Sequence, residues 1–500
     1  MAIAKVIYKT SAEDSGTVWM DTTQKTVTAG TMLSGTTALK NDGTDVTGNI
    51  ASKSSSDLTA NNLTVTAPAG YYASAASKTL SDENLTAGNI KKDVTIFGTT
   101  GTYEGSGGGG GTVEPKDVNF IDYDGTLVAS KTKAEINAMT SDADLPANPS
   151  HTGLTAQGWN WTVAQLKAQL LAMPDDPVTV GQMYVTTSGK TEIDVTMQDG
   201  RLDPILTIAV NGTVTVDWGD NTTADTVTGT SLTTRKSVSH TYASAGDYMI
   251  SIGITSGSFT FYCTSAYTIL RKGTSANVNR VYTNCVKAVR LGNGITSIGQ
   301  YAFYYCASLT SITIPKTVTD LSNGVFEYCF NLDSITIPKG ITIINTNAFY
   351  YCYTLTHISL PSSTTTLETY AFQYCVCLTD ITLPNAVTII GDSAFSNCFA
   401  LAHIAISNAV TTIGANSFSS CYVLTSITIP SSVTSIGNSA FSTCYGMAEY
   451  HILPTSVPSG GTTMFNNIQS DCVIYVPSAK LSDYQAASNW STYASYMQGE

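Results

Sequence analysis

A 23-residue repeat runs through the C-terminal half of this 500-residue sequence and restricts its fold more than any other feature. The repeated phenylalanines are Phe303, Phe326, Phe349, Phe372, Phe395, Phe418 and Phe441. The repeated cysteines are Cys306, Cys329, Cys352, Cys375, Cys398, Cys421 and Cys444. A unit this short cannot bury its apolar side chains alone, so successive units must stack as the coils of a solenoid.

Each unit is predicted to contain one short strand. The pattern Leu-x-x-Ile-x-Ile turns alternate side chains to the same side, as at Leu309, Ile312 and Ile314. A proline such as Pro315 then ends the strand. We expect the cysteines to be small buried hydrophobes, because seven thiols in one column cannot all pair with one another. No Cys-x-x-Cys pair is present, so neither a metal site nor a cofactor is expected.

The repeat unit resembles the bacterial surface leucine-rich repeat of the BspA-like type. The resemblance covers about residues 281 to 485. It implies that residues 266–500 form a BspA-like leucine-rich-repeat solenoid, with a C-terminal cap after the last coil. The whole chain is predicted to be mainly β and multidomain.

Residues 189–265 contain the phrases VDWGDNTTADTVTG and HTYASAGDYMISI. Their Trp218-Gly219-Asp220 and His240-x-Tyr242 resemble the motifs of a polycystic-kidney-disease (PKD) domain. The resemblance implies a small β-sandwich in this segment.

Residues 116–188 resemble the internalin-type B repeat, a β-grasp module of surface proteins, through Asp124-Gly125-Thr126 and the segment ending at Trp159. After Trp161 the sequence departs from that family. There Thr162 can cap a short helix. One face of this helix is predicted to carry Val163, Leu166, Leu170 and Leu171.

The glycine run EGSGGGGG predicts a flexible linker at residues 105–115, because glycine gives the backbone no preferred direction. Before it, residues 1–104 form a predicted β-rich attachment region. The phrases MLSGTTALKNDGTDVTGNI and LTAGNIKKDVTIFGTTGTYEG in this region resemble modules that recur in bacteriophage tail-fibre proteins.

Charge and hydropathy exclude two classes of partner. The net charge is −13, and Lys316 and Lys339 are the only basic residues between positions 300 and 460, so no nucleic acid is expected. No apolar run is long enough for membrane insertion. The sequence shows neither a signal peptide nor an anchor, which favours a protein made in the host cytoplasm and carried in a virion.

One motif suggests an enzyme. NFIDYDGTL resembles the first motif of haloacid-dehalogenase-like phosphatases, in which Asp122 would be the nucleophile and Asp124 the general acid. That chemistry also needs a lysine, further carboxylates for magnesium and an alternating strand–helix pattern. A β-hairpin explains Asp-Gly-Thr without catalysis, so we predict that the chain is not an enzyme.

The candidate receptor-binding residues are polar and aromatic side chains of the solenoid. The aromatic candidates are Tyr305, Tyr328, Tyr351 and Tyr374, which directly precede cysteines, with Tyr353 and Tyr422, which follow them. His357 and His403 share one repeat position, two coils apart. The tyrosine rings can stabilise adjacent coils by stacking, or offer flat platforms to sugar rings. Both interpretations stay open.

The function predicted first is a non-enzymatic, tail-fibre-like virion protein that binds a bacterial host surface. Its expected partners are a host cell-surface glycan or protein and, through residues 1–104, other virion proteins. Assembly of like chains as a trimer is expected through the same region. The alternative is a bacterial cell-surface adhesin of the BspA-like type. A phosphatase using Asp122 and Asp124 ranks third.

Overall fold

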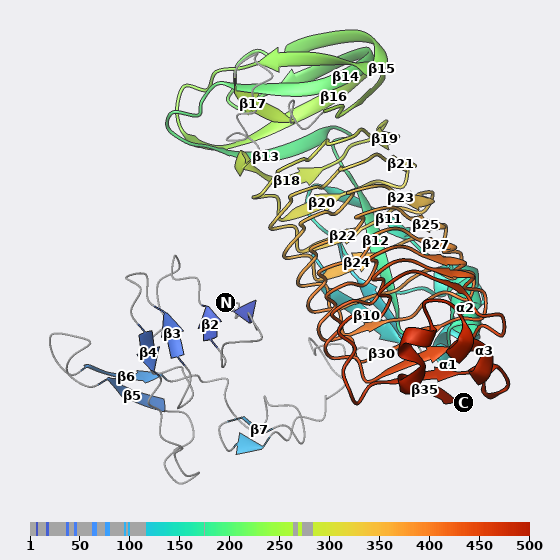
Figure 1. Ribbon diagram of the computed structural model, residues 1–500. Coiled ribbons are helices and arrows are strands. Elements are labelled where there is room, and N and C mark those ends of the chain that lie inside the picture. Colours follow the sequence, from blue (N-terminus) through green and yellow to red (C-terminus); the bar gives the residue numbers. More distant parts are fainter. Residues whose placement is uncertain are drawn as a thin grey trace. The chain divides into compact units, whose positions relative to one another are not determined.

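The computed structural model describes residues 117–174, 176–263, 269–272 and 284–500, together with eight short strands of the first hundred residues (Figure 1). The chain forms two compact units, Met1–Thr112 and Val113–Glu500. The short strands of the first unit are β1 (Ile7–Tyr8), β2 (Thr17–Trp19), β3 (Thr37–Leu39), β4 (Asp45–Thr47), β5 (Leu63–Ala67), β6 (Ala76–Leu80), β7 (Thr95–Ile96) and β8 (Thr99–Thr100). The rest of the predicted attachment region and the glycine linker lie outside the described residues.

Residues 117–188 form a module with a mixed four-stranded sheet. Its strands are β9 (Val118–Ile121), β10 (Leu127–Lys131), β11 (Leu154–Trp159) and β12 (Val178–Thr186). The order is β10-β9-β12-β11, with β9 and β12 parallel in the centre and antiparallel strands outside them. Helices α1 (Lys133–Ala138) and α2 (Val163–Ala172) contribute Ile136 and Leu166 to its core. The internalin resemblance stays a prediction.

Helix α2 begins at the predicted cap. The Thr162 hydroxyl accepts the Gln165 N–H, and the Gln165 side chain accepts the Thr162 N–H, which satisfies two donors at the helix start. The predicted apolar face is wrong in one position. Leu171 is 84% exposed, whereas Gln169 is buried, because the helix turns Gln169 toward backbone groups of the solenoid.

Residues 191–272 add strands to a sheet that continues into the solenoid. They are β13 (Thr191–Met197), β14 (Pro204–Asp217), β15 (Asp225–Ser239), β16 (Gly246–Thr260) and β17 (Leu270–Lys272). The order is β15-β14-β16-β13-β18-β20, with β17 beside β14, where β18 (Val286–Arg290) and β20 (Ser311–Thr313) belong to the solenoid. The predicted sandwich has two sheets, whereas strand pairing here produces one, with irregular register inside β14. The PKD resemblance stays a prediction.

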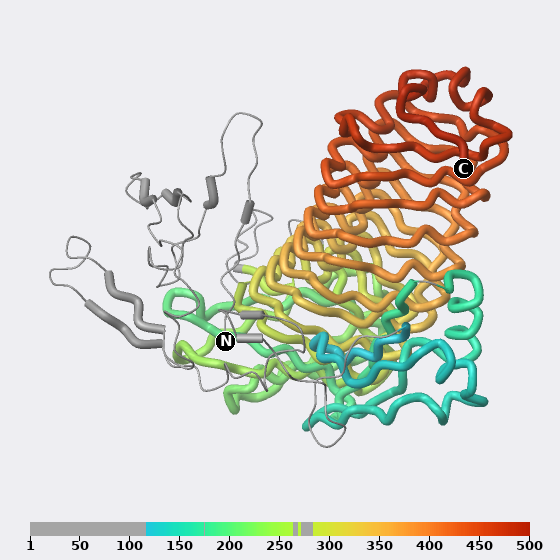
Figure 2. Tube along the Cα trace, turned by 90° about the horizontal axis from the view of Figure 1, so that it is seen from below, coloured from blue at the N-terminus to red at the C-terminus, as the bar shows by residue number. Residues whose placement is uncertain are grey.

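The solenoid consists of stacked coils (Figure 2). Their short strands lie in two parallel ladders, each divided into several hydrogen-bonded sheets. The first ladder contains β18 (Val286–Arg290), β20 (Ser311–Thr313), β22 (Ser334–Thr336), β24 (His357–Ser359), β26 (Asp380–Ile381), β28 (His403–Ile404), β30 (Ser426–Ile429), β32 (Glu449–Ile452) and β34 (Val473–Val476). The second contains β19 (Ser297–Ile298), β21 (Asp320–Leu321), β23 (Ile343–Ile344), β25 (Thr366–Leu367), β27 (Ile389–Ile390), β29 (Thr412–Ile413), β31 (Ser435–Ile436) and β33 (Ser459–Gly460). Ser334 pairs with His357 and Ile343 with Thr366, so the pairs join equivalent positions of successive repeats. The mainly β fold and the solenoid built from the sequence repeat are therefore confirmed.

The repeated phenylalanines and cysteines form two buried columns inside the coils. Adjacent rings from Phe303 to Phe441 stack with centroids 5.3–5.5 Å apart. All seven repeat cysteines are buried and free, as predicted. Each thiol from Cys329 to Cys444 donates to the carbonyl of the phenylalanine in the preceding coil. After the last coil come the short helix α3 (Leu481–Ala486), a 3-10 helix (Ser491–Tyr496) and β35 (Met497–Gly499). Tyr484 of α3 and Trp490, which precedes the 3-10 helix, are buried against the solenoid end.

Candidate functional site

The tyrosines that precede the cysteines occupy an unusual backbone conformation. Tyr305, Tyr328, Tyr351 and Tyr374 have φ between 61° and 63°, a left-handed region that bulky residues seldom enter. The next coil holds them there, because the Tyr328 N–H donates to the Tyr350 carbonyl and the Tyr351 N–H to the Gln373 carbonyl, at 2.8 and 2.9 Å. The coils thus place one tyrosine at the same point of each turn.

The rings of this column form a ladder, and we call these four residues the tyrosine ladder. Tyr328 and Tyr351 stack with centroids 5.1 Å apart, and Tyr351 and Tyr374 with centroids 4.3 Å apart and planes 7° from parallel. Tyr305 is tilted by 48° from Tyr328. All four are partly exposed. Both stacking between coils and access from solvent are therefore present at the same residues.

A second aromatic column, after the cysteines, adjoins the ladder. Tyr353 stacks on Phe330 at 5.2 Å and meets Tyr351 edge-on at 5.4 Å. Its side chain is 37% exposed. Tyr422 belongs to a separate stretch of the column, where it stacks on Phe399 at 4.9 Å. Val376 interrupts the column between these stretches.

Two further tyrosines extend the aromatic surface and were absent from the predicted set. The ring centroids of Tyr350 and Tyr351 are 4.4 Å apart, and those of Tyr370 and Tyr350 are 6.0 Å apart. Tyr370 is 40% exposed. Burial, with a hydrogen bond to Tyr351, raises the pKa of Tyr350. The sequence held a signal for Tyr370, since it stands at the repeat position of Tyr301.

The two candidate histidines lie away from the tyrosine ladder, on the strands of the first ladder. His357 is in β24, where its ring adjoins Gly125 of the module. His403 is in β28, with its Nε2 3.4 Å from an Asp176 carboxylate oxygen. The structure thus separates the candidate histidines from the candidate tyrosines.

The phosphatase motif forms a hairpin between β9 and β10. Asp122 is 4% exposed, and one of its carboxylate oxygens lies 2.6 Å from His151 Nε2. The other accepts the N–H of Tyr123, and Asp124 accepts the N–H of Thr126. These contacts hold a turn and leave the proposed nucleophile enclosed. The mixed sheet also differs from the parallel doubly wound sheet that the phosphatase interpretation requires.

The module of residues 117–188 is docked against the first strand ladder (Figure 2). Asn160 is fully buried there. Its Nδ2 donates to the Ile337 carbonyl at 2.9 Å, and its Oδ1 accepts the Gly181 N–H at 2.9 Å. The Trp161 indole N–H donates to the Leu360 carbonyl at 2.8 Å. Gln169 donates to the Leu383 carbonyl at 3.0 Å.

Prolines explain why the Ile337 and Leu360 carbonyls are free to accept. At the end of a first-ladder strand, a backbone N–H donates to a carbonyl of the preceding coil, as Leu453 donates to Ile429. Pro361 and Pro384 occupy the corresponding positions opposite the Ile337 and Leu360 carbonyls and have no N–H to donate. Asn160 and Trp161 therefore supply the donors that the ladder lacks. Without them, these two buried carbonyls would have no hydrogen-bond partner.

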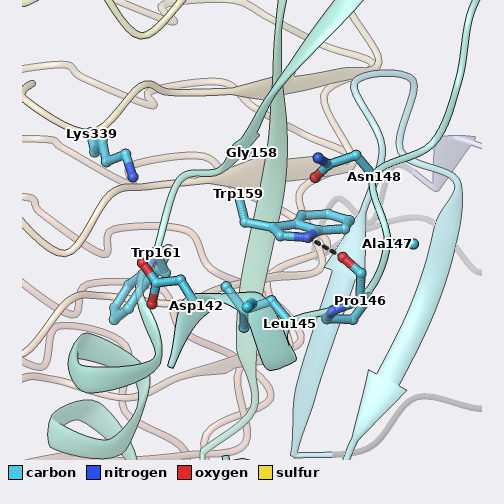
Figure 3. Close-up of a pocket in the computed structure, with 10 residues that line it drawn as sticks. Asp142, Leu145, Pro146, Ala147, Asn148, Gly158, Trp159, Trp161 and Lys339 are labelled. Carbon is cyan, nitrogen blue, oxygen red and sulfur yellow. Dashed lines mark hydrogen bonds between the residues drawn. The ribbon is translucent and has the colours of Figure 1, made fainter. Parts of the chain in front are cut away.

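A cavity of about 290 Å³ lies at this seam (Figure 3). The loop of residues 142–148, the end of β11 and Lys339 of the solenoid line it. The Trp159 indole N–H donates to the Pro146 carbonyl at 2.8 Å across one wall.

Two features are absent from the described part of the chain. No cluster of three or more histidine, cysteine or acidic side chains there could hold a metal ion. Within the same residues, no helix has the length and apolar character needed to cross a bilayer.

Comparison with protein families gives one match. The model of the BspA type leucine rich repeat region matches residues 254–379 and 365–487 in six copies. The matched span contains the repeats that the sequence predicted to resemble this type. No curated protein matches the chain.

Several solved structures are similar to the chain. A leucine-rich repeat protein from Bacteroides ovatus is 27% identical over 38% of this chain and 60% of its own length, with a TM-score of 0.33. The leucine rich repeat protein of T. pallidum is 26% identical over 37% of this chain and 79% of its own, with a TM-score of 0.31. A leucine rich cell surface protein from Faecalibacterium prausnitzii is 25% identical over 49% of this chain and 90% of its own, with a TM-score of 0.26.

Proposed function

We propose that this chain, whose residues 254–487 form a BspA-type leucine rich repeat region, is a non-enzymatic surface adhesin that binds carbohydrate through its tyrosine ladder. The observation that carries the proposal is the stack of Tyr328, Tyr351 and Tyr374, which are partly exposed on successive coils. Aromatic faces bind the apolar faces of sugar rings, and tyrosine adds a hydroxyl for hydrogen bonding.

The spacing of the coils supports a chain-like ligand. Neighbouring parallel strands lie about 4.8 Å apart, and the ring centroids follow at 5.1 and 4.3 Å. Successive units of an extended polysaccharide advance by a similar distance, so consecutive sugars can meet consecutive tyrosines. A set of weak identical contacts along one chain then adds to a useful affinity.

The test compares binding of the full chain and a triple variant to an array of immobilised oligosaccharides. Tyr328→Asn, Tyr351→Asn and Tyr374→Asn are combined, because the solenoid itself places Asn397 at this position with a φ of 61°. Asparagine tolerates this conformation better than alanine. Three lost aromatic contacts of about 0.5–1.5 kcal/mol each predict a loss of at least about tenfold in affinity.

The control variant is Ser420→Ala, at the same repeat position three coils beyond Tyr351. It should bind as the unchanged protein does, and all variants should melt alike. Equal binding by the triple variant would leave the tyrosines as stabilisers of the coils only. An array on which no oligosaccharide is bound would overturn the proposed ligand.

The virion interpretation is a second proposal, and it takes second place. Its support is the tail-fibre resemblance of residues 1–104, together with the proposed trimer and the proposed contacts to other virion proteins. The repeat family of residues 254–487 favours the cell-surface adhesin instead. Antibodies to the purified chain, applied to purified particles and to intact bacteria, distinguish the two locations.

A further inference from the structure

We propose that the cavity at the seam between the module and the solenoid is a binding site for one neutral sugar ring. Binding sites for small molecules are concave, with apolar walls and a few convergent polar groups. This cavity is concave and has both apolar and polar walls, and its volume of about 290 Å³ is just below the usual range for such sites. It therefore fits a single pyranose better than a larger ligand.

The walls are already held in place. Trp159 and Trp161 are 4% and 1% exposed, and their indole N–H groups donate to the carbonyls of Pro146 and Leu360. The first bond fixes the loop of residues 142–148 to β11, and the second fixes the end of β11 to the solenoid. A site that is ordered before binding loses less entropy when the ligand enters.

Hydrogen bonds also fix the loop itself. The Asp144 carboxylate accepts the N–H groups of Thr140 and Ser141, at 2.6 and 3.0 Å. The bonds from the Thr140 and Ser141 backbone lower the pKa of Asp144. Asp142 Oδ1 accepts the Val163 N–H at 2.8 Å, at the start of α2. The side chains that line the cavity thus come from a loop with a defined backbone.

The polar groups at the cavity suit hydroxyl groups rather than an ion. Asp142 offers an acceptor, the Asn148 amide both donates and accepts, and Lys339 offers an ammonium donor. Among the described residues the Lys339 ammonium has no ion pair. A ligand anion would face Asp142 and a ligand cation would face Lys339, whereas hydroxyl groups can donate to one and accept from the other.

The remaining wall suits the apolar face of a sugar ring. Leu145, Pro146 and Trp159 contribute hydrocarbon surface between the polar groups (Figure 3). The C–H groups of a pyranose can pack on such a surface while its hydroxyls reach the rim. The site shares no lining residue with the tyrosine ladder, so either proposal can fail alone.

The experiment uses the full chain and saturation-transfer NMR. The probes are the methyl glycosides of glucose, galactose, mannose and N-acetylglucosamine, with methyl glucuronide as the charged probe. We expect at least one neutral glycoside to bind with a dissociation constant on the order of millimolar, because a ligand with so few atoms gains little binding energy. Ala147→Trp, which fills the cavity, and Lys339→Gln should each weaken binding by about tenfold.

The matched control is Lys316→Gln. Lys316 follows the strand proline as Lys339 does, one coil earlier, and does not line the cavity. It should leave binding unchanged, and all variants should melt at the same temperature. The proposal is overturned if none of the neutral glycosides binds or if Ala147→Trp binds as before. Tighter binding of the glucuronide, lost in Lys339→Gln, would make the cavity an anion site and overturn the ligand class.

Discussion

Replacing Asn160 by leucine should separate the module from the solenoid more strongly than any other single polar substitution at their seam. Leucine has the same number and branching of side-chain heavy atoms but no polar atom, so the Gly181 N–H and the Ile337 carbonyl lose their partner. The Ser359 carbonyl still accepts a hydrogen bond from the Ile337 N–H, at 3.0 Å, after the substitution. Each buried group left unsatisfied costs about 1–3 kcal/mol, so the two together should lower the free energy of opening at the seam by about 2–6 kcal/mol.

A double-mutant cycle with Pro361→Ala tests the cause. Alanine restores the N–H that the ladder lacks opposite the Ile337 carbonyl, so this carbonyl would no longer depend on Asn160. In that background Asn160→Leu should leave only the Gly181 N–H unsatisfied. The cost should therefore fall by the contribution of one group, about 1–3 kcal/mol, which appears as coupling between the two sites.

Hydrogen exchange measured by mass spectrometry on peptides from β11 and β12 gives the free energy of local opening at the seam. The control is Asn408→Leu, because Asn408 donates to the Ala172 carbonyl at the same seam but is exposed. It should change the opening free energy by no more than about 0.5 kcal/mol. A cost below about 1 kcal/mol for Asn160→Leu, or the same cost with and without Pro361, would refute the role given to the prolines.

Three further predictions concern the core and the predicted absence of phosphatase activity. Phe349→Ala should cost about 3–5 kcal/mol in thermal or urea unfolding, because it empties a fully buried site, whereas Tyr351→Asn should cost about 1 kcal/mol from lost stacking. Burial raises the pKa of Cys444 to about 12, so this thiol should stay unmodified by iodoacetamide in the native protein, as mass spectrometry of its peptide would show, whereas the partly exposed Cys377 can react. The stability that the Cys444 thiol contributes is present below pH 9.0 and is lost as the pH rises through the raised pKa. With magnesium, the protein should not hydrolyse a phosphate ester above background, and turnover lost in both Asp122→Asn and Asp124→Asn would contradict this.

The repeat was predictable because its core is identical from coil to coil. A phenylalanine that recurs at the same position of every repeat must find the same environment each time, and stacking of the coils is the arrangement that provides it. The conformation of Tyr351 was not predictable in this way. Its left-handed φ of 62° comes from the hydrogen bond that its N–H makes to Gln373 of the next coil. Residue preference alone would favour asparagine or glycine there.

The docking of the module could be predicted only in part. Pro361 and Pro384 mark strand ends, and the same prolines imply that a carbonyl on the preceding coil lacks its ladder donor. The sequence therefore contained the location of the missing hydrogen bonds. It did not contain their partner, because Asn160 and Trp161 lie 177 and 199 residues from the carbonyls that they satisfy. Local periodicity, which placed Leu171 in the core, cannot report contacts at such separations. The helix α2 buries Gln169 instead, because an amide can satisfy the backbone of the solenoid and a leucine cannot.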